Sequence, residues 1–260
     1  MSLKLVSLAS GSKGNATLIF SDSTAILVDA GISYTRLTKE LKDFGLTPDM
    51  LDGVVITHEH SDHVSGLPKL CEVCDVYVHD RTAREIFKRQ GALKRVASVD
   101  HYECGFEIGD IKVVPFRIPH DAEYPLAYSF ECGHARCSVA TDIGVPTVGV
   151  LRNIRESSVV LLESNHDLTM LKEGKYPHNL KTRILSNNGH LSNDSCARIA
   201  QLLLEGSEVQ TLVLGHISQN NNTEELAYRT VSNMLKECNN TQMDLYLAHQ
   251  DRRSEVFEII

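Results

Sequence analysis

The residue types best suited to metal chemistry gather in residues 57–63 of this sequence, Thr-His-Glu-His-Ser-Asp-His. They follow directly on the apolar run Val54–Ile56, which predicts a buried strand that holds the segment in place. Nitrogen and oxygen ligands without thiolate favour a hydrolytic ion that keeps a coordination position for water, because closed structural sites usually include cysteine. The spacing predicts two neighbouring pockets, one with His58 and His60 and the other with Asp62 and His63.

Further ligands are expected just past the ends of later strands, where loops gather to form sites. His120, Asp142 and His216 each stand shortly beyond a run of apolar, strand-like sequence. Any one of them alone is typical of a surface or capping residue. In this order after the first cluster, they predict a centre with seven ligands.

The elements that must position these residues are mainly short strands separated by Gly, Ser, Asn and Asp turns. Apolar patterns predict strands at residues 3–8, 17–20, 25–29, 54–57, 75–78, 111–114, 127–131, 137–141, 159–162, 211–214 and 245–248. Helices are predicted at 34–44 (with Ser33 as N-cap and Gly45 as stop), 81–89, 193–205 and 224–237. Two sets of strands with helices outside them predict an α/β fold, a four-layer αββα sandwich. No linker-like stretch interrupts residues 1–260, so a single domain is expected.

The composition of the sequence bears on where the protein acts and what it can bind. The sequence has no run of about 18 apolar residues, and its start lacks a basic stretch followed by an apolar one, so neither a membrane span nor a secretory signal is expected. Seven cysteines, an odd number, favour reduced thiols in a cytoplasm over a disulfide scaffold. The net charge of −8 counts against a protein that coats nucleic acid, since phosphate backbones favour Lys and Arg. A nucleic-acid enzyme with this balance would bind through a local basic patch or through its metals.

The order of these ligands resembles the metal-site pattern of the metallo-β-lactamase superfamily. Asp29, in the run Leu-Val-Asp-Ala-Gly at 27–31, matches the early aspartate that braces the metal loop in that superfamily. Four segments are similar to its YycJ/WalJ branch of 5′–3′ exonucleases: 10–15 (SGSKGN), 162–167 (LESNHD), 189–193 (GHLSN) and 215–221 (GHISQNN). The motifs of the second half are also similar to those of tRNA 3′-processing endonucleases.

The resemblance implies the metallo-β-lactamase type of αββα sandwich and two divalent metal ions, whether Zn, Mn or Fe. It implies one ion held by His58, His60 and His120, and a second held by Asp62, His63 and His216, with Asp142 bridging them. Two dications about 3.5–4 Å apart lower the pKa of a shared water to about 7, so a metal-bound hydroxide is the expected nucleophile.

His190 is a candidate for proton transfer and substrate contact, and it joins Asp62 in the expected catalytic set. It lies ahead of a helix whose start is marked by Ser192 or Asn193, and a helix N-terminus favours bound phosphate. Glu163, at a strand end, is the candidate partner that orients the imidazole. A capping role for His190, and His166 acting in its place, are the alternatives.

The Gly-rich segment 10–15 is a second candidate for substrate contact. Backbone N–H groups in such a loop can face an anion, which makes Ser12, Lys13 and Asn15 candidate substrate-binding residues. A tight hairpin turn is the alternative.

Two other patterns carry weaker predictions. Cys71-x-x-Cys74 has no second matching pair, so a short helix with Leu67 and Leu70 packed inward is favoured over a metal or redox site.

The chain shows no long insertion that would serve as a dedicated nucleic-acid clamp. The densest basic stretch is either a solvated helix face or a track for a phosphate backbone, and consists of Arg81, Arg84, Lys88, Arg89, Lys94 and Arg95.

The favoured function is a two-metal phosphodiesterase that acts on nucleic acid, DNA or RNA, from an end, with the 5′–3′ direction implied by the resemblance. The alternative is a metal-dependent hydrolase of a small molecule such as a cyclic phosphodiester, a thioester or a lactone, and the acidic net charge favours it. A non-catalytic metal-binding module is the third hypothesis. Retention of all seven ligands argues against that one.

Overall fold

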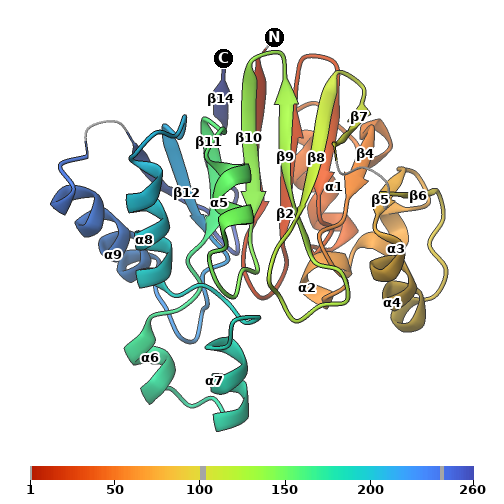
Figure 1. The fold of residues 1–260 in the computed structure, drawn as a ribbon. Helices are drawn as coiled ribbons and strands as arrows, with labels where there is room; N and C mark the ends of the chain where they lie inside the picture. Colours follow the sequence, from red (N-terminus) through yellow and green to blue (C-terminus); the bar gives the residue numbers. More distant parts are fainter. Residues whose placement is uncertain (1, 100–103, 241–242) are drawn as a thin grey trace.

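The computed structural model describes residues 2–99, 104–240 and 243–260. Within these ranges, two sheets of seven strands each pack face to face (Figure 1). The first sheet has the order β14-β1-β2-β3-β4-β5-β6, with strands Phe257–Ile259, Leu3–Ala9, Ala16–Phe20, Ala25–Val28, Gly53–Val55, Val76–Val78 and Val96–Ser98. The second has the order β13-β12-β11-β10-β9-β8-β7, with strands Asp244–Leu247, Thr211–Gly215, Val159–Glu163, Ala135–Ala140, Leu126–Cys132, Ile111–Arg117 and Phe106–Ile108.

Central strands such as β1, β3 and β11 are buried on both faces, since successive side chains point to opposite sides of a sheet and nearly all of theirs are buried. In β1, Leu5 packs between the sheets whereas Val6 faces the outer helices. In β11, Leu161 lies between the sheets and Leu162 lies under the helices of the second sheet. Such strands appear in the sequence as continuous apolar runs rather than alternating ones.

Helices cover the outer face of each sheet. The helix α1 (Tyr34–Lys42) packs Leu37 and Leu41 on the first sheet and is capped by the Ser33 hydroxyl, which accepts from the Arg36 N–H. The helices α3 (Leu67–Leu70) and α4 (Asp80–Gln90) also cover this sheet. The second sheet is covered by α5 (Val148–Ile154), α8 (Asn193–Leu203) and α9 (Glu224–Glu237). The predicted four-layer αββα sandwich is confirmed.

In the described ranges, four further helical segments lie outside these layers. The short α2 (Ser61–Val64) and the 3₁₀ turn η1 (Pro48–Met50) belong to connections of the first sheet. The helices α6 (Leu168–Glu173) and α7 (His178–Ile184) project together beyond the strand ends, at the end of the sandwich opposite the two termini (Figure 1). In the part of the chain that the structure describes, no helix combines the length and apolar character needed to cross a bilayer.

The sequence patterns missed the weakest elements. The strands β6, β7 and β14 have three residues each and lie at sheet edges, so they lack the apolar run that marked the central strands. The helices α5, α6 and α7 have six or seven residues, less than two full turns of regular apolar repeat.

Candidate metal centre

The histidine-rich loop is fixed to the first sheet through Asp29. This residue directly follows β3, has φ 61° and is buried. Its carboxylate accepts the Thr57 N–H at 2.9 Å and lies 2.7 Å from His63 Nδ1. The strands β3 and β4 are parallel neighbours, so their carboxyl ends bring Asp29 and the loop to the same edge. The bracing role that the resemblance implied for Asp29 agrees with these contacts.

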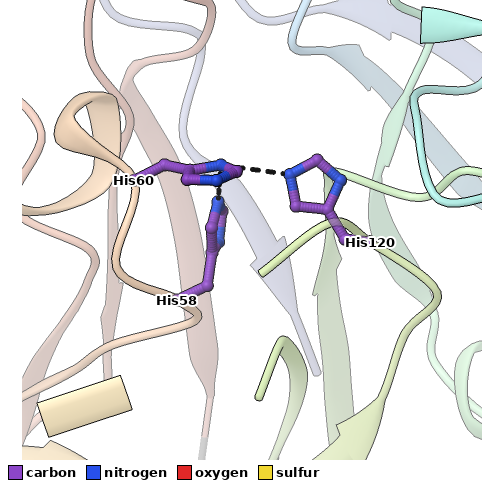
Figure 2. Close-up of side chains that lie close together, drawn as sticks. All are labelled: His58, His60 and His120. Atoms are coloured by element: carbon purple, nitrogen blue, oxygen red, sulfur yellow. Dashed lines mark hydrogen bonds between the residues drawn. The ribbon is translucent and has the colours of Figure 1, made fainter. Parts of the chain in front are cut away.

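Three histidines converge at the centre of this edge (Figure 2). His58 Nε2 lies 3.0 Å from His60 Nδ1, and His120 Nε2 lies 3.2 Å from that same atom. His58 and His60 come from the loop after β4, whereas His120 follows β8 of the opposite sheet. The three residues form a group compact enough to hold one ion.

A second group adjoins the first. Asp62, His63 and His216 also form a compact set, and so do His58, His63 and Asp142, so the two groups share a boundary. Asp142 Oδ2 lies 3.3 Å from His63 Nε2, and Asp142 Oδ1 lies 3.6 Å from His216 Nε2 and 3.7 Å from His120 Nε2. The structure therefore brings all seven predicted ligand residues together, with Asp142 between the two triads.

The outer nitrogens of four histidines are occupied by protein groups, which turns the other nitrogen of each ring inward. His63 Nδ1 meets Asp29, His58 Nδ1 lies 3.0 Å from the Thr57 hydroxyl, and His120 Nδ1 lies 3.0 Å from the Gly189 carbonyl. His216 Nδ1 lies 2.9 Å from Glu163 Oε1. Metal-binding histidines are typically oriented in this way, because a partner on one ring nitrogen fixes the tautomer and the ring direction.

Burial and neighbouring charge divide the histidines into two kinds. Burial lowers the pKa of His58 well below its ordinary value and also lowers the pKa of His60 and of His120, which keeps these rings neutral. Burial alone would lower the pKa of His216 as well, but Asp142, Asp62 and Glu163 raise it to about 10. Asp142 and Asp29 likewise raise the pKa of His63 well above its usual range despite burial.

The residues fit divalent metal. Two inward-facing atoms, Asp142 Oδ2 and His216 Nε2, are buried without a hydrogen-bond partner among the described residues. Buried polar atoms are normally satisfied, so such atoms point to a missing ligand. Neutral imidazoles and buried carboxylates within reach of one another are the donor set that divalent transition metals accept. A bound divalent cation would thus be the partner that these ring nitrogens and carboxylates lack.

His190 and Glu163 lie beside this cluster. His190 Nδ1 is 2.7 Å from Glu163 Oε1, the oxygen that also contacts His216. The other oxygen, Glu163 Oε2, accepts the N–H groups of Ile143 and Leu191 at 2.7 and 3.1 Å. His190 and His216 outweigh the effect of burial and lower the pKa of Glu163 to about 2, so the group is a carboxylate at neutral pH.

The alternatives for His190 are less well placed. Ser192 caps α8, with its hydroxyl accepting the Ser195 N–H, so His190 is not the capping residue. His166 is buried at a bridge to Ser192, and neither of its ring nitrogens has a hydrogen-bond partner in the described ranges. Burial lowers the pKa of His166 to about 4. It does not line the cavity that holds the cluster.

The segment 10–15 forms a tight turn against the site. Asn15 is buried, and its side chain accepts the Gly11 N–H at 2.8 Å and lies 3.1 Å from His63 Nε2. Lys13 is exposed and donates its backbone N–H to Gln250 Oε1. Ser12 lines the cavity. Asn15 therefore has its amide committed to the protein, and of the three candidate substrate-binding residues Ser12 is the one that belongs to the cavity lining.

The cavity over the cluster has a volume of about 350 Å³ and exposes residues that the sequence patterns did not single out. Arg183, Leu180 and Ile184 come from α7, and Tyr176 comes from the turn before it. Arg183 makes a two-pronged pair with Asp121, with Nη2 3.0 Å from Oδ1. These residues lie between the 162–167 and 189–193 motifs, so their position in the chain was the available signal.

The six residues of the basic stretch differ in their partners and in their distance from the cavity. Lys88 pairs with Glu85, Lys94 with Glu72 and Arg95 with Asp75. Arg81 lies over the Tyr124 ring, and Arg84 lines a separate surface hollow. Arg89 alone among the six lines the cavity over the cluster. Three of the six charges are thus paired with acids, and Lys94 and Arg95 lie in the connection after α4 rather than on its face.

Cys71 and Cys74 are free thiols at the end of α3. Leu67 and Leu70 are fully buried, as the helix interpretation predicted. Burial raises the pKa of Cys74 to about 12, so this thiol stays protonated and unreactive.

The chain is similar in sequence and in fold to known proteins. Residues 24–217 match a family model described as a beta-lactamase superfamily domain. The chain is 35% identical to exodeoxyribonuclease WalJ of Streptococcus pneumoniae over 89% of its length and 87% of that relative. It is 35% identical to exodeoxyribonuclease YycJ of Bacillus anthracis over 91% of its length and 90% of that relative. The metallo-beta-lactamase fold protein YhfI of Bacillus subtilis superposes with a TM-score of 0.72 over 99% of this chain and 100% of its own, at 14% identity.

These matches confirm the resemblance inferred from the sequence motifs and the expected metallo-β-lactamase type of sandwich. They also confirm that the chain is a metal-dependent hydrolase.

Proposed function

Because this chain belongs to the beta-lactamase superfamily, we propose that it is a two-metal phosphodiesterase that degrades nucleic acid from an end, as a 5′–3′ exonuclease. The observation that carries the proposal is the cluster of seven candidate metal-ligand side chains beside the His190–Glu163 pair, under a cavity whose lining includes Asp62, Asp142, His190 and His216. The names of the two relatives, both exodeoxyribonucleases, support DNA as the substrate.

The ligands divide between two ions. His58, His60 and His120 would hold one, and Asp62, His63 and His216 would hold the other. Asp142 is suited to bridge them, because its carboxylate approaches histidines of both groups. When bound, two such ions supply an activated water at neutral pH and neutralise the charge that develops on phosphorus.

His190 is assigned as the general acid. Glu163 occupies its Nδ1, which leaves Nε2 free to donate a proton to the leaving oxygen of the cleaved ester. Glu163 contacts His190 and His216 through one oxygen, so a single carboxylate positions both the proton donor and a metal ligand. It acts as a positioning residue for both.

Arg89, Arg183 and Ser12 are the candidate contacts for the phosphate. Guanidinium groups bind phosphate oxygens in a planar, two-pronged geometry. Both arginines line the cavity beside Asp62 and His190. The seven cysteines, all free thiols in the structure, support a cytoplasmic setting for the enzyme.

An end-labelled digestion series tests this function. Purified protein is loaded with Zn²⁺, Mn²⁺ or Fe²⁺ and given single- and double-stranded DNA and RNA labelled at either end. We expect short products from the 5′ end with at least one metal. Release of label only from the 3′ end would reverse the direction, and inactivity on every oligonucleotide would overturn the nuclease assignment.

The same assay separates a second function, hydrolysis of a small molecule. The narrow cavity of about 350 Å³ favours a compact substrate, as does the net charge of −8. Activity on bis-p-nitrophenyl phosphate, a cyclic dinucleotide, a thioester or a lactone, with none on oligonucleotides, would favour it. Protein that binds two metals and hydrolyses none of these esters would be a metal-binding module.

A further inference from the structure

The segment from Leu168 to Asn188 has a charge opposite to that of the rest of the chain. It contains Lys172, Lys175, Lys181 and Arg183 against a single acid, Glu173, so its charge is +3 where the whole chain carries −8. It comprises α6, α7 and the turn between them. The sequence patterns did not mark this short segment as an insertion. In the structure its two helices project from the sandwich (Figure 1).

Both ends of this basic arm are anchored in the candidate site. Glu163 and Asn165 come just before it, and His190 comes just after it. The Gly189 carbonyl at its far end lies 3.0 Å from His120 Nδ1. Tyr176, Leu180, Arg183 and Ile184 form one wall of the cavity, so the arm borders the metal cluster directly.

The positive charges of the arm are mostly available. Lys172 and Lys175 are exposed, and neither has a carboxylate partner among the residues that the structure describes. Lys181 donates to the Lys172 carbonyl at 2.7 Å, which ties α7 to α6 without neutralising charge. Only Arg183 is paired, with Asp121 at the cavity. By comparison, Lys88 on α4 and Lys94 and Arg95 in the connection after it are each paired with an acid.

An aromatic ring completes the surface. Tyr176 is half-buried in the cavity wall, with its hydroxyl accepting from Asn220 Nδ2 at 2.9 Å. Aromatic rings beside basic grooves stack nucleobases without regard to sequence. The ring thus lines the cavity and is the next residue in sequence after the exposed Lys175.

We propose that the α6–α7 arm holds the phosphate backbone of the nucleic-acid strand that leads into the cavity, with Lys172 and Lys175 as its outer contacts and Tyr176 as a stacking surface. The inference rests on the proposed nuclease function. It gives a net acidic protein the local basic patch that a polyanionic substrate requires. The arm acts on binding, and the chemistry stays with the cluster and His190.

The test compares the double variant Lys172→Ala/Lys175→Ala with Lys39→Ala/Lys42→Ala. The control removes the same charge from exposed positions on α1, a helix on the outer face of the first sheet. The KM for a labelled 20-nucleotide strand and the Kd of the chelated protein for it are measured between 50 and 200 mM salt. Hydrolysis of bis-p-nitrophenyl phosphate and of a dinucleotide reports on the site without the arm.

We expect the arm variant to raise KM and Kd for the long strand about 10-fold and to reduce the slope of log Kd against log salt by about 1.4, two contacts at about 0.7 each. The two small substrates should be turned over as by the unmodified protein, and the control variant should match it throughout. Lys172→Arg/Lys175→Arg should restore binding.

The outcomes separate the two proposals. If the unmodified protein degrades the strand and the arm variant behaves like the control, the proposed role of the arm is wrong and the nuclease function stands. If the unmodified protein neither binds nor degrades any strand, both proposals fail together.

Discussion

Asp29, Asp142 and His216 share a left-handed backbone, with φ of 61°, 61° and 54°. For residues with a Cβ this conformation costs about 1–2 kcal/mol each. All three stand where a strand ends at the metal cluster, and each turns its side chain toward that cluster. Strained backbone of this kind persists where the surrounding packing over-determines it, and it gathers at functional sites. At the residue scale, the side chains of the centre are therefore positioned by residues in an unfavourable backbone conformation.

The role assigned to His190 gives a prediction at this scale. His190→Ala should lower kcat by about 10²- to 10⁴-fold, because a positioned proton donor contributes an effect of that size. Its metal content should stay unchanged, since the seven ligands remain. Elemental analysis and steady-state kinetics on the same preparation provide the measurement.

His166→Ala is the matched comparison, because His166 is a buried histidine near by that does not line the cavity. It should alter thermal stability while turnover stays close to that of the unmodified protein. Full activity in His190→Ala, or loss of activity confined to His166→Ala, would reverse the assignment.

At the scale of elements, local patterns predicted well what is local. The spacing of residues 57–63 and the N-cap of α1 depend on neighbours in sequence, and the structure has the cluster and the capped helix where they were expected. The central strands were predictable for the same reason. The sharing of Glu163 between His190 and His216 was not, because it depends on the register of β11 and β12, which sets Glu163 opposite Gly215. Pairing register between strands far apart in sequence leaves no local signal.

The packing of the loop that carries Asp62 gives the second prediction. A Cβ on Gly31 would lie 1.6 Å from the Asp62 carbonyl oxygen and 2.6 Å from the Asn15 N–H nitrogen. Both are backbone atoms, so Gly31→Ala must displace the loop. We expect an about 10- to 100-fold loss of metal affinity, the range seen when supports of metal ligands are removed.

Gly149→Ala is the control, because a Cβ there meets nothing closer than 3.7 Å in the first turn of α5. It should be neutral or slightly stabilising, since alanine favours a helix. Metal titration followed by calorimetry compares the two. Equal metal affinity in both variants would show that the position of the loop does not govern ion binding.

At the scale of the whole molecule, the candidate metal centre draws residues from both sheets. Four of its candidate ligands follow β4 of the first sheet, whereas His120, Asp142 and His216 follow strands of the second. The core between the sheets draws on both as well. We propose that residues 1–260 form one domain that unfolds in a single transition, with bound ions clamping one end of the sandwich.

Metal should therefore raise the Tm of the whole chain, and by more as the pH rises. At 100 times its Kd, a ligand that binds only the folded state adds about 2.7 kcal/mol, which corresponds to about 5–10 °C for a chain of this size. Without metal, His216 contributes stability as a cation, since its pKa is raised to about 10. That contribution is complete below about 6.5, the pKa of an unfolded histidine, and disappears as the pH rises through about 10.

Metal must displace these protons from His216 and from His63, whose pKa is also raised, so each proton released makes apparent metal affinity increase about 10-fold per pH unit. Above about 6.5, the pKa of an unfolded histidine, His58, His60 and His120 are neutral in both states, so rising pH there removes the stability given by His216 and His63 and strengthens metal binding. In that range the two effects have the same sign. Calorimetric scans at pH 6, 7 and 8, with Zn²⁺ or with chelator, measure the difference in Tm. A difference that shrinks as the pH rises, or two separate transitions in the presence of chelator, would contradict a metal centre that replaces protons and joins both sheets.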